Sequence, residues 1–279
     1  MRSRTIATLA TAACLAAAGL SAAGPAEAIV GGYQVTDDRF AFMASIQDAG
    51  ANGTDGHFCG GSVISQRWVL TAAHCIDLTG VQAKDIQVAV GRDNLDQDLA
   101  EGQTLLVDRI EVHPDYDGGP FDAALVHVTE DITSAPAIPL VARGEDTLEQ
   151  DGARLTVAGW GTEFFGSPAA AAQLKAVDVR AVADSSCTTN QAMGFEPDLE
   201  ICASELLGDS CQGDSGGPLF GTLPDGRRVQ VGIVSYGLGC ATPGFPGVYA
   251  EVNNASIHQF ITGTAGLTGT TATRSKKER

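Results

Sequence analysis

A serine that could act as a nucleophile, Ser215, lies in the segment GDSCQGDSGGPL at residues 208–219. A serine hydroxyl is a weak nucleophile until a base takes its proton, and the usual base is a histidine held by a third group. His74, in the run TAAHC, precedes Cys75, which a disulfide could hold in place. Asp122 begins the apolar run DAALVHV, where its carboxylate could be buried against the ring's second nitrogen. These residue types predict acyl transfer through a serine nucleophile.

The elements that must position these residues are predicted to be short β-strands. β-Branched and apolar runs alternate with glycine and proline turns, and helical periodicity begins only near Ser256. The predicted strands are 61–64, 68–71, 86–90, 105–112, 123–128, 155–158, 229–235 and 247–252. This pattern favours an all-β protein built from barrels or a sandwich. The polar, proline-containing segment 134–149 is predicted to connect two halves.

The N-terminus has the pattern of a secretory signal peptide, predicted over residues 1–28. Two arginines precede an apolar, alanine-rich run, and small residues follow it up to Ala28. The run is too short for a membrane span, and no later stretch is long and apolar enough to be one. Cys14 would leave with this peptide, so six of the seven cysteines would remain. An even number of cysteines in an exported chain predicts disulfides, in any of 15 connectivities.

The net charge of −17 at pH 7 bears on the choice of partner. Carboxylates are spread along the chain, so the surface should repel nucleic acid and anionic lipid. We therefore expect no nucleic-acid partner and no membrane partner. Cationic polypeptides are the better electrostatic match. The alternative is that this charge serves only the solubility of an exported protein.

Seven short motifs occur in an order that is informative as a whole. They cover the chain from Ile29 to about Phe260. The motifs are IVGG at 29–32, CGGSVIS at 59–65, LTAAHC at 70–75, DAAL at 122–125, GWG at 159–161, GDSGGPL at 213–219 and PGVY at 246–249. Together they resemble the trypsin branch of the chymotrypsin-like serine proteases.

This resemblance implies a fold and a domain organisation. The expected fold is all-β, with two six-stranded antiparallel β-barrels, a catalytic cleft between them and a short C-terminal helix. The barrels are expected at residues 29–138 and 139–262, and a mobile tail at 263–279. From Thr262 onward the chain is rich in Thr, Gly and Ala, and it ends in RSKKER. Such a segment buries little apolar surface.

The resemblance also assigns roles in catalysis. His74 would be the general base and then the general acid, Asp122 would orient its ring, and Ser215 would attack the peptide carbonyl. The backbone N–H groups of Gly213 and Ser215 would form the oxyanion hole. Ser235 matches a serine that hydrogen-bonds the buried aspartate, although it could be an ordinary strand serine.

Asp209 matches the acid at the floor of the primary specificity pocket. Gly237 and Gly247 match the pocket walls, where missing side chains leave room for a long, slim group. A carboxylate under an open channel suits Arg or Lys. Tyr236 stands where the family more often has Trp, and substrate backbone is expected along Ser235, Tyr236 and Gly237. The alternative for Asp209 is a solvated loop acid.

Asp214 matches the acid that pairs with the new α-amino group of Ile29 once a precursor is cut. Many relatives carry Arg or Lys before this terminus, whereas here Glu27 and Ala28 precede it. Activation by a trypsin-like enzyme is therefore not expected. Two routes stay open: signal peptidase cuts after Ala28, or it cuts earlier, for example after Ala23, and another protease trims a short propeptide.

The family pattern selects one disulfide connectivity, and we expect no cofactor. The implied pairs are Cys59–Cys75, Cys187–Cys202 and Cys211–Cys240. The family's calcium loop usually begins Gly-Glu, but here it begins with Gly91 and Arg92. Its acids, Asp93, Asp96, Asp98 and Glu101, could still collect a cation. They are interpreted as a solvated acidic loop, and we predict no metal there. The other histidines, at positions 57, 113, 127 and 258, have no acid partner suggested by their sequence context.

The function implied is that of a secreted, extracellular, monomeric endopeptidase, made as a zymogen, that cuts after Arg or Lys. Its partners would be protein or peptide substrates and protein protease inhibitors. One alternative is an inactive family member that serves as a binding or scaffold protein, but every catalytic residue is present. Another is a regulatory protease with few targets, whose choice would be set by the loops at 47–56 and 163–172.

Overall fold

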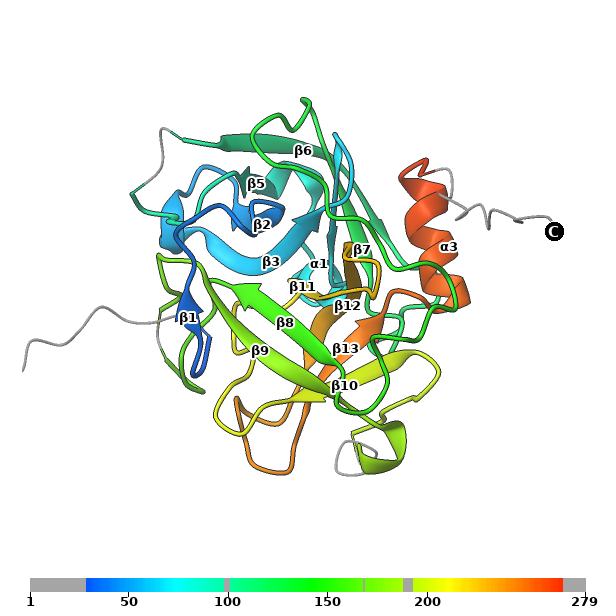
Figure 1. The fold of residues 1–279 in the computed structure, drawn as a ribbon. Helices are drawn as coiled ribbons and strands as arrows, with labels where there is room; N and C mark the ends of the chain where they lie inside the picture. The colour runs from blue at the N-terminus through cyan, green and yellow to red at the C-terminus, as the bar shows by residue number, and fades with distance from the viewer. Residues whose placement is uncertain (1–28, 98–100, 168, 188–192, 268–279) are drawn as a thin grey trace, which may run out of the picture.

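A computed structural model describes residues 29–97, 101–167, 169–187 and 193–267 of the chain. The predicted signal peptide, Asp98 and the end of the predicted tail lie outside these residues. Two barrels, one above the other in Figure 1, make up most of the described chain. This confirms the predicted all-β class.

The first barrel closes in the order β2-β3-β4-β7-β6-β5, and all its neighbours are antiparallel. Its strands are β2 (Met43–Asp48), β3 (His57–Val63), β4 (Trp68–Thr71), β5 (Ile86–Val90), β6 (Gln103–Val112) and β7 (Ala124–Val128). The inward positions carry Val, Ile and Leu, whose burial drives closure. Strand β2 also buries two polar residues, Ser45 and Gln47.

The second barrel follows the order β9-β10-β13-β12-β11-β8 and closes through the pairing of β8 with β9. Its strands are β8 (Arg154–Gly159), β9 (Lys175–Val182), β10 (Glu200–Ser204), β11 (Pro218–Thr222), β12 (Arg228–Tyr236) and β13 (Gly247–Glu251). The short strand β1 (Tyr33–Gln34) pairs with β9. The chain therefore begins on the second barrel before it forms the first.

Helices are few and short in the described residues. They are α1 (His74–Asp77), α3 (Ala255–Thr264) and the 3-10 turns η1 (Gly53–Asp55), η2 (Ala83–Asp85) and η3 (Asp184–Ser186). Asn254 caps α3, since its side chain accepts hydrogen bonds from the N–H groups of Ser256 and Ile257 at 2.8 and 3.2 Å. Helix α3 extends to Thr264, so it includes the first two residues of the predicted tail.

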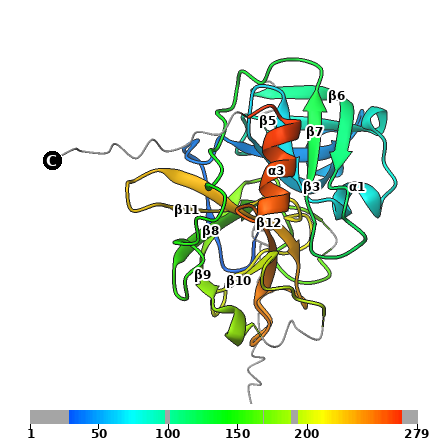
Figure 2. The ribbon, with the colours of Figure 1, turned by 90° about the vertical axis from the view of Figure 1, so that its right-hand side faces the viewer.

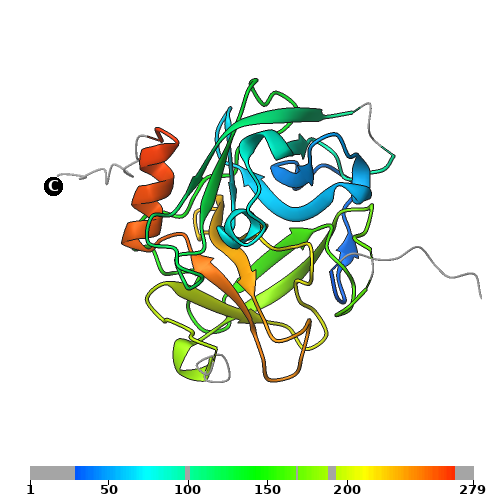
Figure 3. The same ribbon diagram turned by 180° about the vertical axis from the view of Figure 1, so that it is seen from behind.

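Helix α3 packs on the first barrel although it follows the second in sequence (Figure 2). The ring of Phe260 lies 5.0 Å from the ring of His113, which stacks on Phe121. Seen from behind, α1 lies between the two barrels (Figure 3). In the described part of the chain, no helix has the length and apolar character needed to span a membrane.

Buried polar contacts also join the two barrels. The Ser62 hydroxyl of β3 donates to Oε1 of Gln230 on β12 at 2.6 Å, and both residues are fully buried. The Gly60 N–H donates to the carbonyl oxygen of Ser215 at 2.8 Å. Buried polar groups cost free energy unless they are paired, so these bonds favour one arrangement of the barrels. That arrangement sets the geometry of the cleft.

Candidate active site

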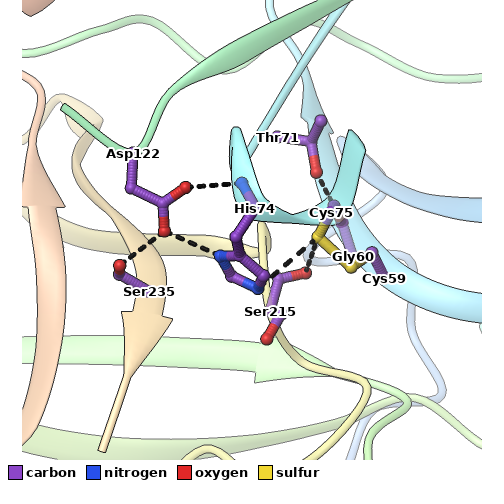
Figure 4. A network of polar contacts seen from close by, with 8 residues as sticks. All are labelled: Cys59, Gly60, Thr71, His74, Cys75, Asp122, Ser215 and Ser235. Carbon is purple, nitrogen blue, oxygen red and sulfur yellow. Dashed lines mark hydrogen bonds and ion pairs between the residues drawn. A yellow bond between two sulfur atoms is a disulfide. The ribbon is translucent and has the colours of Figure 1, made fainter. Parts of the chain in front are cut away.

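His74 is held by Asp122 at the junction of the barrels (Figure 4). The imidazole Nδ1 lies 2.7 Å from Asp122 Oδ2, and the His74 backbone N–H donates to Oδ1 at 2.8 Å. The Ser235 hydroxyl donates to the same carboxylate at 2.5 Å, which is the contact predicted for it. Asp122 is only 2 % exposed, so these donors fix an acceptor that water barely reaches. The ring is thereby oriented with Nε2 directed away from the acid.

Ser215 lies on the Nε2 side of that ring (Figure 4). The disulfide between Cys59 and Cys75 packs beside both groups, with Cys75 Sγ 3.8 Å from His74 Nε2 and 3.7 Å from the Ser215 carbonyl oxygen. The structure therefore brings the three residues of the predicted triad together from three separate segments.

The loop before Ser215 depends on a backbone conformation that glycine favours. Gly213 has φ +92°, in a region that side chains disfavour. The carboxylate of Asp214 is fully buried and accepts hydrogen bonds from the N–H groups of Cys211 and Gly161, both at 2.8 Å. Burial raises the pKa of Asp214 to about 7, although these hydrogen bonds oppose the rise. The carboxylate is therefore only partly charged at neutral pH, and a cation beside it would favour the charged form.

Ile29 is buried in the second half of the molecule. Its side chain is fully buried, and the next residue, Val30, exchanges backbone hydrogen bonds with Asp209 at 3.2 and 3.3 Å. Gly31 has φ +65°, and a Cβ there would meet the Leu207 carbonyl oxygen at 2.0 Å. The IVGG segment thus passes where only a glycine fits, next to the segment that contains both aspartates.

A cavity of about 200 Å³ opens beside Ser215. Other lining residues include the predicted substrate-binding set, namely Asp209, Ser235, Tyr236, Gly237 and Gly247. A Cβ at Gly247 would lie 2.9 Å from Asp209 Oδ1, whereas at Gly237 the nearest atom is 3.8 Å away. The absence of a side chain at Gly247 therefore leaves space beside the Asp209 carboxylate.

Within the described part of the chain, only one of the two carboxylate oxygens of Asp209 has a hydrogen-bond donor. Its Oδ2 accepts from the Ala241 N–H at 2.9 Å, while the buried Oδ1 has no hydrogen-bond partner among the described residues. Burial raises the pKa of Asp209 to about 6, partly offset by backbone hydrogen bonds. A buried, unpaired carboxylate oxygen is costly and selects a ligand that can donate to it. The predicted alternative, a solvated loop acid, does not fit this burial.

Tyr236 has a partner that sequence reasoning missed. Its hydroxyl donates to Oε2 of Glu200 at 3.2 Å, and Glu200 is 2 % exposed. Burial raises the pKa of Glu200 to about 7. Glu200 begins strand β10 within the run EICAS, and a charged residue at the start of an otherwise buried strand was the available signal.

Among the other histidines, one has an acid partner that its sequence context did not suggest. His127 does have an acid partner, because its Nδ1 lies 2.6 Å from Asp108 Oδ1. An irregularity in the pairing of β6 with β7 falls at Asp108, opposite His127, which the sequence does not reveal. His57 is buried between Ser45 and the Gly213 carbonyl, and burial lowers its pKa to about 4.

The disulfides pair as predicted, Cys59–Cys75, Cys187–Cys202 and Cys211–Cys240. Among the described residues, Cys59, Cys75 and His74 form a tight group of possible metal ligands. Both sulfur atoms belong to a disulfide, so they are not thiolates that could bind a metal. In the predicted acidic loop, Asp96 accepts from Thr54 and Asp93 from the Asp38 N–H.

Two closed antiparallel barrels with a serine, a histidine and an aspartate at their junction define the class of chymotrypsin-like serine proteases. The sequence model described as Trypsin matches residues 29–260. The chain therefore belongs to the trypsin family and is a serine endopeptidase, a hydrolase that acts on proteins or peptides.

Several known proteins are similar to this chain along most of its length. Hypodermin-B from Hypoderma lineatum is 37% identical over 230 residues, which cover 81% of this chain and 83% of that protein. Trypsin 5G1 from Aedes aegypti is 36% identical over 245 residues, 86% and 85% of the two chains. A trypsin-like protease from Streptomyces glaucescens is 35% identical over 237 residues, 84% and 82%.

Proposed function

We propose that this chain is a secreted endopeptidase that hydrolyses peptide bonds after Arg or Lys. The observation that carries the proposal is the unpaired Oδ1 of Asp209 in the cavity that also holds Ser215. An ammonium or guanidinium group would supply the missing donors, whereas an uncharged side chain would leave a buried charge without a partner. Selectivity would come from both effects.

The reaction would pass through an acyl-enzyme. The Oγ of Ser215 attacks the peptide carbonyl carbon while His74 Nε2 takes the hydroxyl proton, and Asp122 stabilises the resulting imidazolium. The carbonyl electron pair moves to oxygen, which accepts from the N–H groups of Gly213 and Ser215. Collapse expels the amine with the proton from His74. Water then attacks the ester by the same steps, releasing the new carboxyl terminus and restoring Ser215.

The substrate backbone would lie along Ser235, Tyr236 and Gly237, which line the same cavity. Protein inhibitors that present Arg or Lys to Asp209 would bind the same cleft. The signal-like segment at residues 1–28 supports export to the extracellular space. We expect the enzyme to act there as a monomer, with halves at 29–138 and 139–262.

A substrate panel tests this function. Secreted protein beginning at Ile29 should hydrolyse peptide substrates ending in Arg or Lys at least about 10³-fold faster than matched Phe or Glu substrates, because only cations satisfy Asp209. An organophosphonate should label Ser215 with one equivalent. Absence of both hydrolysis and labelling would support the inactive scaffold protein instead. Equal rates across the panel would refute the specificity alone.

The second proposed role concerns Asp214 and the α-amino group of Ile29. In the uncut chain, no ammonium exists at Ile29, and the buried carboxylate has a pKa raised from 3.8 to about 7. Its burial then costs more free energy as pH rises between those values. Cleavage before Ile29 would supply a cation, and a buried pair of this kind typically costs about 3–5 kcal/mol to break.

One extra residue before Ile29 should therefore lower kcat/KM about 10²–10³-fold at pH 7. The pair raises the pKa of the amino group above its free value of about 7.7–8.0, so its contribution is complete below that value and is lost as pH rises through the raised pKa. Activity of the cut enzyme should thus decline at alkaline pH. The check is a pH profile of both forms, and a fully active extended form would show that the pair is not needed.

A further inference from the structure

A row of buried polar side chains crosses the first barrel and ends at the loop of the proposed oxyanion hole. We call its members, Gln87, Gln47, Ser45 and His57, the polar row. They are 5, 1, 0 and 9 % exposed. Gln47 on β2 lies opposite Gln87 on β5 and also opposite His57 on β3. The strand register therefore stacks these side chains side by side.

The outer end of the row is tied to the backbone of residues 50–53. Gln87 Oε1 accepts from the Gly50 N–H at 3.2 Å, and its Nε2 donates to the Ala51 carbonyl at 2.5 Å. An N–H cannot accept and a carbonyl cannot donate, so these contacts fix the orientation of the amide. The same Nε2 donates to Gln47 Oε1 at 3.3 Å. The Gln47 amide is oriented in turn, with Nε2 toward the Gly53 carbonyl at 3.4 Å.

The inner end of the row is fixed by the Gly213 carbonyl. That oxygen lies 3.0 Å from His57 Nε2, which must carry the proton because a carbonyl only accepts. Burial lowers the pKa of His57 to about 4, so the ring is neutral and its Nδ1 is an acceptor. Ser45 then donates to Nδ1 at 2.8 Å and accepts from Gln47 Nε2 at 3.0 Å. The donor and the acceptor of every hydrogen bond in the polar row are therefore fixed.

The peptide at the end of the row, Gly213–Asp214, lies between the two peptides that carry the proposed oxyanion donors, the N–H groups of Gly213 and Ser215. The Gly213 carbonyl belongs to the same peptide unit as the Asp214 N–H, which donates to the Cys211 carbonyl at 3.0 Å. Gly213 has φ +92°, and a glycine can rotate freely to other conformations. A fixed donor on its carbonyl restricts rotation of the Gly213–Asp214 peptide about the Gly213 Cα, and so limits how the N–H groups of Gly213 and Ser215 can be turned relative to each other.

We propose that Gln47 and Gln87 are positioning residues for the oxyanion hole, which transmit the conformation of the 50–53 backbone through Ser45 and His57 to the Gly213 peptide. This proposal rests on the proposed function, in which the Gly213 N–H binds the developing oxyanion. Apolar residues at positions 47 and 87 would also fill the barrel, and they would not bury amides that each need hydrogen-bond partners. Apolar packing would not favour any one orientation of the Gly213 carbonyl, whereas the directed hydrogen bonds of the polar row do.

The test compares a reactive and an unreactive ligand of the same pocket. A peptide argininal adds Ser215 Oγ to its aldehyde carbon, the hydroxyl proton passes to His74, and the carbonyl pair becomes an oxyanion that needs the Gly213 N–H. Benzamidine offers an amidinium to Asp209 and makes no oxyanion. Gln47→Met and Gln87→Met remove the amides at similar side-chain length. The matched control is Gln103→Met, because Gln103 on β6 also bonds backbone groups of the same barrel, at Thr133 and Ser134.

We expect Gln47→Met and Gln87→Met each to weaken argininal binding and kcat about 3–30-fold, with benzamidine affinity and KM changed less than twofold. The double variant should match the stronger single one, since both residues lie on one path. Ser45→Ala, the smallest change in the row, should show the same split. All values are taken per active site titrated with the organophosphonate, which removes any unfolded fraction.

The proposal is overturned if the variants lower only the melting temperature and leave the ratio of the two affinities unchanged, as expected for Gln103→Met. In that case the amides serve the stability of the barrel. Failure of the proposed function is a separate outcome, because the unsubstituted enzyme would then bind neither the argininal nor the phosphonate. A change in argininal affinity with every variant, including Gln103→Met, also refutes a specific path.

Discussion

Replacing Ser215 with Ala should lower kcat on Arg substrates by about 10⁶-fold, the loss typical of a serine protease without its nucleophile. The physical reason is that the reaction loses its covalent intermediate, because Cys75 Sγ, which also lies near His74 Nε2, belongs to a disulfide and cannot accept the acyl group. A smaller residual rate should remain, because the oxyanion donors and the specificity pocket still bind the transition state. Single-turnover kinetics with an Arg ester would measure it.

His74→Ala should cost about as much as Ser215→Ala, and the double variant little more, because serine and base act as one unit. Benzamidine affinity is the control, since it depends on Asp209 and should not change. A Ser215→Ala protein that kept more than about 1% of the activity would exclude Ser215 as the nucleophile.

The second large effect is expected at the floor of the cavity. Asp209→Ser should lower kcat/KM for Arg and Lys substrates about 10⁴-fold, because the substrate cation would be buried without its counter-charge. Cleavage after apolar residues should stay level or rise, since the variant no longer leaves an unpaired carboxylate oxygen beneath them. Phosphonate labelling of Ser215 should proceed, which separates specificity from catalysis.

The pH dependence of benzamidine binding sharpens this prediction. Burial raises the pKa of Asp209 to about 6, so the carboxylate is charged above that pH and becomes neutral below it. Benzamidine affinity should therefore fall as pH drops through about 6 in the native enzyme and stay flat in Asp209→Ser. Asp225→Ser is the control, because Asp225 lies in an exposed turn beside Arg227. An unchanged preference for Arg in Asp209→Ser would refute the pocket.

Much of the barrel architecture follows from the hydrophobic pattern, and the exceptions have physical causes. Strands β5, β7, β8, β12 and β13 lie close to their predicted ranges, since each is a β-branched apolar run. Strand β2 was missed because its sequence MASIQD places Ser45 and Gln47 in the interior, where the polar row pairs them. Strand β11 begins at Pro218 and contains Gly221, so its propensity is weak and its neighbours β8 and β12 hold it.

The residues of the candidate site also fall into those that local sequence predicts and those that it does not. His74, Asp122, Ser215 and Asp209 stand in motifs that can be read locally. The partners of Glu200 and His57 could not be predicted, because the Tyr236 hydroxyl and the Gly213 carbonyl lie far away in sequence. The first pairing depends on the strand arrangement within the second barrel and the second on how the two barrels dock, and no local pattern contains either.

The crossed packing of the two chain ends has a consequence for the timing of biosynthesis. The first strand rests on the second barrel, and the last helix rests on the first. A growing polypeptide that has emerged only as far as Asp122 therefore lacks the Ser235 hydroxyl, helix α3 and the proposed nucleophile, Ser215. The candidate catalytic site can therefore form only after most of the polypeptide has been made.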